Sequence, residues 1–334
     1  MNLGKLVVLI SKLPYADKEA LFEALSEMVK PYSGDIMDSV KEIREPHCPY
    51  CKKQNIIGHG KYRGRQRYKC KDCKKTFNDF TASPLAGTHY PDKWAEHITL
   101  MLNGASLKRV ASELDIHVST AFYWRHKVMS TLCAVEPDVL QGIIESDGKL
   151  FLESSKGKNQ VRKYGHRAPR KRGGKASKRG VSNEQVCVLV AIDRTGAIVS
   201  KTAGLGDVST EEIKAVIGKY VPKKAVFCSD GAPAYGAFAR EWDLTHYKLN
   251  ATKKKRVIEK VYHIQHVNSY HSRMELLINN YFRGVSSRHL DKYLAWQRFM
   301  EMHRNTDKCA LKEELLKTVF RPEYFSTVKT LRVA

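Results

Sequence analysis

The stretch Gly142-Ile143-Ile144-Glu145-Ser146-Asp147-Gly148-Lys149-Leu150-Phe151-Leu152 places two carboxylates inside an apolar run. This composition predicts a buried or half-buried β-strand, on which Glu145 and Asp147 share one face because they lie two residues apart. A carboxylate in the middle of such a strand needs a partner, since an unpaired buried charge is costly. A cation, a hydrogen-bond network or a metal ion can all fill that role. The stretch alone therefore leaves two interpretations of Asp147, a structural ion pair and an active site.

Composition points to a folded protein with a polyanionic partner. The chain has 334 residues, of which 42% are hydrophobic and 28% charged, as expected for a globular protein of two or three domains. Its 58 Lys and Arg against 35 Asp and Glu give a net charge of +23. This charge indicates a polyanionic partner, and nucleic acid is a more common partner of this kind than membrane headgroups. No signal peptide and no membrane-spanning run stands out. We expect a cytoplasmic, nucleoid-associated bacterial protein with no membrane partner.

Two cysteine pairs mark the first motif. Cys48-Pro49-Tyr50-Cys51 and Cys70-Lys71-Asp72-Cys73 are separated by eighteen residues, a spacing typical of a four-thiolate zinc site. We therefore predict a zinc ribbon over residues 45–82, with Cys48, Cys51, Cys70 and Cys73 as ligands and the metal supplying much of its stability. The alternative is two unrelated pairs.

The ribbon is basic, and Asp72 is the one acidic residue between the two ends of the motif. Arg65 and Arg67 are predicted to contact the DNA backbone, although a solvated basic face would have the same composition.

Residues 90–133 have the pattern of a helix-turn-helix. A short helix beginning after Ser106 is followed by a turn and by a second helix beginning after Ser119, and both serines are suitable N-caps. The second helix would be the major-groove reader. Its predicted DNA-binding side chains are Tyr123, Arg125 and Lys127. Any two short helices can imitate this pattern, so the prediction depends on the neighbouring ribbon and the basic charge. Outside this motif, two helical patterns in residues 1–44 predict a helical hairpin. Residues 305–334 are predicted to form a helical tail.

The second half predicts a mixed α/β domain with a basic insertion. After the opening strand, residues 156–180 are rich in Lys, Arg and Gly and contain no acid, so they cannot form a core. We predict that this insertion clamps nucleic acid near Asp147 through Arg170, Lys171 and Arg172; a generic charged loop is the alternative. Two more strands follow, and then alternating helices and strands, which indicates a mixed sheet with an antiparallel start.

Asp230 is the natural partner for Asp147. It ends the apolar strand Ala225-Val226-Phe227-Cys228-Ser229-Asp230, and in a mixed sheet this strand can lie beside the one that carries Asp147. Two adjacent carboxylates repel unless they are protonated or share cations. Their oxygens suit Mg²⁺ or Mn²⁺, and a pair of such ions supports phosphoryl transfer.

These motifs together resemble the zinc-ribbon insertion-sequence transposases, the ISXO-like group of the DDE superfamily. The resemblance covers about residues 45–300 and rests on GIIESDGKLFLESSKG, RKRGGKASKRGVSNEQVCVLVAIDR, FCSDGAPAY and HIQHVNSYHSR. It implies an RNase H-like catalytic domain over 142–304, two divalent metal ions, and cleavage and joining of element-end DNA. Asp147 matches the first catalytic Asp, Asp230 the second and Asn268 the third position. His271 and Arg273, in the same motif as Asn268, are expected to contact DNA.

The chain departs from this family in two places. Gly148 follows the first Asp, where Glu is common, and Glu275 stands seven residues after Asn268, where Lys is frequent. Glu275 could therefore complete an Asp-Asp-Glu metal set in place of Asn268, or it could be a solvated helix residue.

We expect a DNA transposase that acts as at least a dimer, because two element ends must meet. A decayed or repurposed DNA-binding protein, and a nuclease that does not join DNA, are the alternatives.

Overall fold

The computed structural model describes residues 9–11, 13–28, 43, 47–156, 174–249, 256–320 and 324–333. Most of the first helix predicted within residues 1–44 lies outside these described residues. Arg170, Lys171 and Arg172 of the basic insertion also lie outside them. The chain forms two compact units, which are described separately. One comprises Met1–Thr81, Gly87–Val118 and Asp307–Arg321; the other comprises Ala82–Ala86, Ser119–Thr306 and Pro322–Ala334.

The first unit contains the predicted ribbon and several helices. Its antiparallel strands are β1 (Ile56–Tyr62), β2 (Arg65–Cys70) and β3 (Thr76–Phe77). The turn between β1 and β2 is a two-residue turn in which Arg63 and Gly64 both have positive φ, 50° and 76°, the geometry that suits the twist of a hairpin. The helices are α2 (Tyr15–Met28), α4 (Trp94–Leu102), α5 (Leu107–Glu113) and α12 (Lys308–Phe320).

Both helices of the predicted helix-turn-helix form. Ser106 is the N-cap of α5, where its side chain accepts a hydrogen bond from the Arg109 N–H. The second helix, α6 (Val118–Ala134), begins before the predicted N-cap Ser119, which therefore lies in its first turn. Because α5 belongs to the first unit and nearly all of α6 to the second, their arrangement as a DNA-reading motif stays a prediction.

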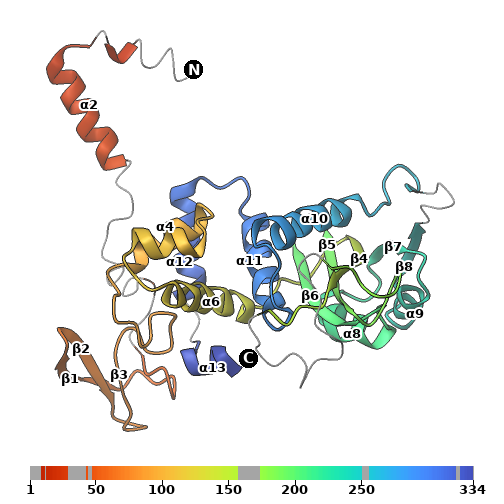
Figure 1. The fold of residues 1–334 in the computed structure, drawn as a ribbon, viewed down its shortest axis with the longest axis horizontal. Coiled ribbons are helices and arrows are strands. Elements are labelled where there is room, and N and C mark those ends of the chain that lie inside the picture. Colours follow the sequence, from red (N-terminus) through yellow and green to blue (C-terminus); the bar gives the residue numbers. More distant parts are fainter. Residues whose placement is uncertain are drawn as a thin grey trace. The chain divides into compact units, whose positions relative to one another are not determined.

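A five-stranded sheet organises the second unit (Figure 1). In space the strands run β6-β5-β4-β7-β8; β4, β5 and β6 are antiparallel, and β4, β7 and β8 are parallel. Three antiparallel strands leading into two parallel ones is the order of the RNase H-like fold, as the sequence predicted. The strands are β4 (Ile143–Leu152), β5 (Gln185–Asp193), β6 (Ile198–Leu205), β7 (Val226–Asp230) and β8 (Thr245–Leu249).

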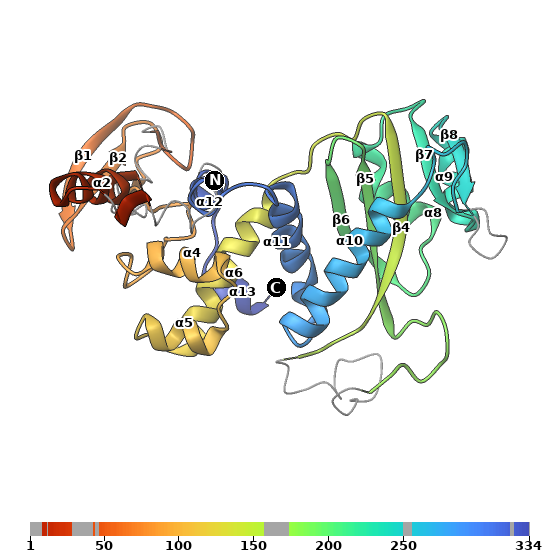
Figure 2. The same ribbon diagram turned by 90° about the horizontal axis from the view of Figure 1, so that it is seen from above.

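Helices cover both faces of this sheet (Figure 2). Against one face, α8 (Thr210–Ile217) and α9 (Pro233–Glu241) pack on a core that includes Ile144, Leu189 and Phe227. On the other, α10 (Gln265–Glu275) contacts β4 and β5, and α11 (Leu290–Met302) contacts β6. Directly after Glu275, α10 widens into a π-helical turn, Leu276–Tyr281. Successive side chains of a strand point to opposite faces, and Ile144 points into the apolar core. Glu145 and Asp147 therefore point to the other face, toward α10.

The remaining helix of the second unit is α13 (Val328–Val333). Within the described parts of the chain, no helix combines the length and apolar character needed to cross a lipid bilayer.

Asp193 fixes the turn between β5 and β6. Its buried carboxylate accepts hydrogen bonds from the N–H groups of Thr195 (2.8 Å) and Ala197 (3.0 Å), and from that of Gln141 (2.8 Å) just before β4. Gly196 completes the turn with φ 96°. One side chain thus links the turn to the start of the central strand.

Replacing Asp193 by alanine should lower the free energy of unfolding by about 2–3 kcal/mol, because several backbone donors would lose their acceptor. Chemical denaturation measures this change. The exposed Asp207→Ala is the control and should stay within about 0.5 kcal/mol of the wild type. Equal stability of Asp193→Ala and Asp207→Ala would contradict this account of the turn.

Candidate functional site

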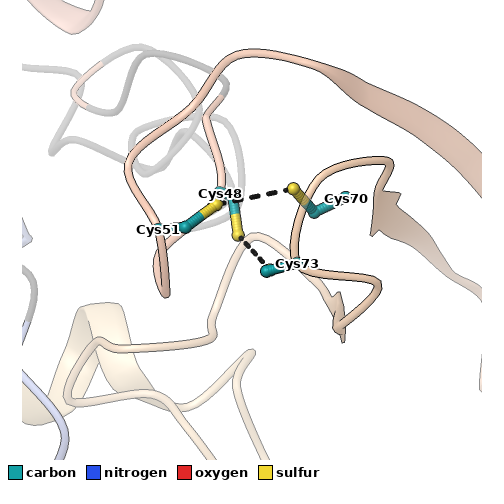
Figure 3. Close-up of side chains that lie close together, drawn as sticks. All are labelled: Cys48, Cys51, Cys70 and Cys73. Carbon is teal, nitrogen blue, oxygen red and sulfur yellow. Dashed lines mark hydrogen bonds between the residues drawn. The ribbon is translucent and has the colours of Figure 1, made fainter.

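The four predicted zinc ligands lie together in the ribbon (Figure 3). The Sγ atoms of Cys48 and Cys73 are 3.5 Å apart, and those of Cys51 and Cys70 are 3.6 Å apart. A tetrahedral zinc ion with Zn–S bonds of about 2.3 Å requires sulfur–sulfur separations of about 3.8 Å. The cluster therefore fits a structural zinc ion with only small adjustment.

The two cysteine turns repeat the same backbone geometry. In the first, the Cys48 N–H donates to the carbonyl of Lys53; in the second, the Cys70 N–H donates to that of Lys75. Lys52 and Lys74, the residues directly after the second cysteine of each pair, both have positive φ, 65° and 62°. A hydrogen bond from the Cys73 N–H lowers the pKa of Cys70 to about 7, which favours the thiolate that binds metal.

The predicted DNA-binding arginines of the ribbon have partners inside it. Arg65 lies over the ring of Phe80, 4.5 Å from its centroid, and Arg67 donates to Thr76 Oγ1 at 3.2 Å. Both are half-buried. The exposed basic and aromatic side chains of the hairpin are instead Lys61, Tyr62 and Arg63 at its tip.

Asp147 and Asp230 lie side by side on parallel strands. The pairing of β4 with β7 places Ser146 opposite Ser229, and the next residue on each strand is an aspartate. Burial, followed by the charge of Asp230, raises the pKa of Asp147 to about 7. A carboxyl group in this state binds a proton or a cation near neutral pH.

Helix α10 runs along β4, and side chains of β4 contact the helix at successive points. Glu145 Oε2 accepts hydrogen bonds from the backbone N–H groups of His266 (2.9 Å) and Val267 (3.3 Å) at the start of the helix. Farther along, Lys149 Nζ donates to Glu275 Oε2 at 2.7 Å. Two residues of a strand span about 6.6–6.8 Å along its axis, and four to five residues of a helix span about 6–7.5 Å. Because these lengths are similar, every second residue of β4 meets a side chain one turn farther along α10.

His271, on α10, lies beside Asp147. Its Nδ1 is 3.7 Å from Asp147 Oδ2, and its ring is buried. Burial, and next the charge of Lys149, lowers the pKa of His271 to about 4, so its imidazole is neutral. Its burial is at odds with the predicted contact to DNA.

The two candidates for the third metal position differ in their surroundings. Asn268 lies one helical turn before His271 and is exposed. Glu275 lies one turn after His271, and its carboxylate pairs with Lys149.

The surroundings of Gly148 explain one departure from the family pattern. A Cβ atom at this position would lie 3.1 Å from Cys187 Sγ and 3.7 Å from the hydroxyl of Tyr235. Both side chains belong to the core below the sheet, so a larger residue at 148 would have to displace packed neighbours. Burial, followed by the charges of Asp147 and Asp230, raises the pKa of Tyr235. Nothing in the sequence marks Tyr235 except its place in FCSDGAPAY.

Several side chains predicted to bind DNA are already engaged. In α6, Arg125 and Lys127 are only 6% and 3% exposed. Arg125 lies over the ring of Phe282, and Lys127 donates to the carbonyl of Ala86, so their burial is at odds with the predicted reading of bases. Burial lowers the pKa of Lys127 to about 8.

Two further predicted DNA contacts are partly buried. Tyr123 is half-buried against Phe122. Arg273 donates to Glu301 Oε1 at 2.6 Å and joins α10 to α11.

Zinc removal should unfold the ribbon. We expect Cys70→Ser to lose the bound zinc and the amide-exchange protection of β2 and β3, because structural zinc in isolated fingers contributes about 10–16 kcal/mol of apparent binding free energy. Metal analysis and hydrogen exchange measure both effects. Cys309→Ser, at an exposed cysteine outside the cluster, is the control. Unchanged zinc content in Cys70→Ser would rule out this ligand set.

Asp147 should make the metal-free protein less stable as the pH rises. Because its folded pKa of about 7 lies above the ordinary value of 3.8, the folded state holds this proton more tightly. The resulting stability is complete below about pH 4 and is lost as the pH rises through 7. Asp147→Asn, which cannot ionise, should therefore raise the unfolding free energy at pH 8, by up to about 4 kcal/mol, and much less at pH 4. Thermal unfolding at both pH values, with exposed Asp138→Asn as control, measures the difference; a gain independent of pH would contradict the assigned pKa.

Comparison with known proteins relates part of this chain to one family. Residues 139–301 match the ISXO2-like transposase domain. A Halobacterium salinarum protein, described as an uncharacterized protein in transposable element ISH50, is 29% identical over 291 residues, covering 84% of this chain and 94% of that protein. Two solved structures are similar at low TM-scores. A pre-cleavage Mos1 transpososome has a TM-score of 0.25 and 13% identity, with 71% of this chain and 79% of that chain covered. A Mos1 mariner paired end complex with Mn has a TM-score of 0.27 and 14% identity, with coverage of 69% and 79%. Residues 139–301, whose RNase H-like sheet pairs Asp147 with Asp230, thus match the domain of ISXO2-like transposases, and the chain is similar to insertion-sequence transposases of the DDE superfamily.

Proposed function

We propose that this transposase cleaves DNA at the ends of its insertion element and joins them to target DNA, with Asp147 and Asp230 at the centre of the reaction. The observation that carries the proposal is the pairing of these two aspartates on adjacent parallel strands, where burial and mutual repulsion raise the pKa of Asp147 to about 7. A structural ion pair would have the opposite effect on this pKa.

The carboxylate pair suits divalent cations. Two hard oxygen ligands with unneutralised repulsion match Mg²⁺ or Mn²⁺, and we propose that Asp147 and Asp230 hold two such ions. When bound, the ions activate the attacking oxygen and stabilise the leaving oxygen of a phosphodiester. The attacking group is then water or a DNA 3′-hydroxyl, so the chain itself forms no covalent bond to DNA.

We assign the third position to Asn268 rather than Glu275. Glu275 forms an ion pair with Lys149 at 2.7 Å, so metal binding by Glu275 would first have to break that pair. Asn268 is exposed on the same helix and matches the family motif. Neutral His271 lies between them and packs against Asp147, which supports a role in holding that carboxylate in place.

DNA binding rests on the basic charge of the chain and on exposed groups. The +23 net charge favours a phosphate backbone. In the ribbon, the exposed Lys61, Tyr62 and Arg63 suit this contact better than the engaged Arg65 and Arg67. The basic insertion 156–180 and the helix-turn-helix are further proposed contacts, and joining two element ends requires at least a dimer.

The test uses oligonucleotides that carry an element end, with Mg²⁺ or Mn²⁺. We expect Asp147→Asn, Asp230→Asn and Asn268→Ala to reduce cleavage by more than the ~100-fold that loss of an outer-shell partner can cost, while DNA binding persists. Asp138→Asn and Glu275→Gln should cleave like the wild type.

Other outcomes separate the alternatives. A wild-type chain that binds element ends without cleaving them would indicate a repurposed DNA-binding protein. Cleavage with no joining of a 3′-hydroxyl end would indicate a nuclease. Loss of cleavage in Glu275→Gln, with Asn268→Ala active, would reverse the assignment of the third position.

A further inference from the structure

A second group of possible metal ligands lies at the start of α10, separate from the aspartate pair. Glu145, His263 and His266 each place one ligand atom within 4.8 Å of the others. The carboxylate of Glu145 is 1% exposed, whereas the ring of His266 is 55% exposed, so the group opens to solvent on one side. His263 comes from the segment just before the helix.

The guanidinium of Arg194 occupies the centre of this group. Its Nη1 is 3.0 Å from Glu145 Oε1, 3.2 Å from His263 Nε2 and 2.8 Å from His266 Nδ1. Its Nη2 also donates to the carbonyl of Val261 at 3.0 Å. The position among the three ligand atoms is therefore one that a positive charge already fills.

The hydrogen bonds around His266 make conflicting demands on one ring nitrogen. His266 Nδ1 faces the donor Arg194 and, at 2.6 Å, the acceptor Glu145 Oε1, although one nitrogen cannot serve both. His263 Nδ1 lies 3.3 Å from both the Gln265 N and Glu145 Oε1, and its Nε2 faces Arg194 Nη1. A cation without protons, in place of the guanidinium, removes the conflict at His266 Nδ1, because Glu145 and His266 can then both be its ligands.

The ligand set selects the class of cation. Two imidazole nitrogens with one carboxylate oxygen suit zinc and similar transition metals better than Mg²⁺, which prefers an all-oxygen shell. Bonds of about 2.0–2.1 Å in a tetrahedral zinc site put ligand atoms about 3.3–3.4 Å apart. The separations from Glu145 Oε1 to the Nδ1 atoms of His266 and His263, 2.6 and 3.3 Å, need only small shifts.

We propose that Glu145, His263 and His266 bind a divalent ion of the zinc class, which displaces the Arg194 side chain. Arg194 is 27% exposed and can move toward solvent when the ion enters. Glu145 already accepts hydrogen bonds from the first N–H groups of α10, so an ion held by Glu145 and His266 fastens the start of this helix to β4. The ion and Arg194 are competing ways to neutralise the same buried carboxylate.

Competition predicts opposite effects for two substitutions. In the full-length protein with its ribbon zinc bound, the wild type should take up one additional Zn²⁺ per chain. Arg194→Gln, which removes the competing cation, should bind that ion on the order of tenfold or more tightly, a change of the size seen when groups around a metal site are altered. His266→Ala, at a largely exposed side chain, should lose it. Titration with Zn²⁺ against a chromophoric chelator measures all three.

Controls separate this ion from the ribbon zinc. His59→Ala removes an exposed histidine elsewhere and should bind the additional ion like the wild type. Co²⁺ bound at the second site should lack the thiolate-to-metal absorption of the ribbon, because its ligands are nitrogen and oxygen. Zn²⁺ should raise the melting temperature of Arg194→Gln, whose Glu145 charge is otherwise unpaired.

Two results would overturn the proposal. One is equal uptake of additional Zn²⁺ by the wild type and His266→Ala. The other is affinity in Arg194→Gln no higher than in the wild type. If Arg194→Gln does not fold even with Zn²⁺, the comparison of the wild type with His266→Ala decides. None of these measurements uses DNA cleavage, so they stand apart from the proposed catalytic role of Asp147.

Discussion

The hydrogen bonds from the start of α10 to the buried carboxylate of Glu145 fix the helix against the central strand, and the rest of the site depends on that contact. Helix N-termini carry unpaired N–H groups and a partial positive charge, so a carboxylate there is stabilising. Ile264, at the N-cap position of α10, provides no side-chain hydrogen bond, and the strand supplies the acceptor instead. From this point the spacing of strand and helix brings His271 to Asp147 and Glu275 to Lys149. Along one face of β4, Glu145 thus caps the helix, Asp147 meets His271, and Lys149 forms an ion pair with Glu275.

Much of the fold could be predicted because its signals are local. The cysteine spacing, the strand around Asp147 and the strand ending at Asp230 each depend on a few neighbouring residues, and the order of elements indicated the mixed sheet. We predicted from the order of the strands that the two aspartates would be adjacent. The parallel pairing of β4 with β7 agrees with this prediction.

Side-chain partners could not be read in the same way. Arg125 and Lys127 have the composition of a DNA-reading helix, yet tertiary packing buries them beneath other elements of their unit. Glu145 was noticed as a carboxylate, but its partners lie about 50 residues away, at Arg194, and about 120 residues away, at His266. The conflict between Gly148 and the family pattern likewise depends on Cys187, which belongs to the neighbouring strand. The charge and periodicity of a segment indicate which contacts its side chains could make. Only the packed structure shows which of those side chains are exposed and available for such contacts.

The ion pair between Lys149 and Glu275 bears on how such proteins diverge. The family pattern that the sequence resembles has lysine at the position of Glu275, on the helix. In this chain the cation stands instead on the strand, two residues beyond Asp147, and the helix carries the opposite charge. A lysine at both positions would place two like charges within a few ångströms, and a change at only one position would leave its partner without a counterion. These two sites, 126 residues apart in sequence, therefore form one electrostatic unit, and exchanging the two charges between strand and helix preserves the pair only if both residues change.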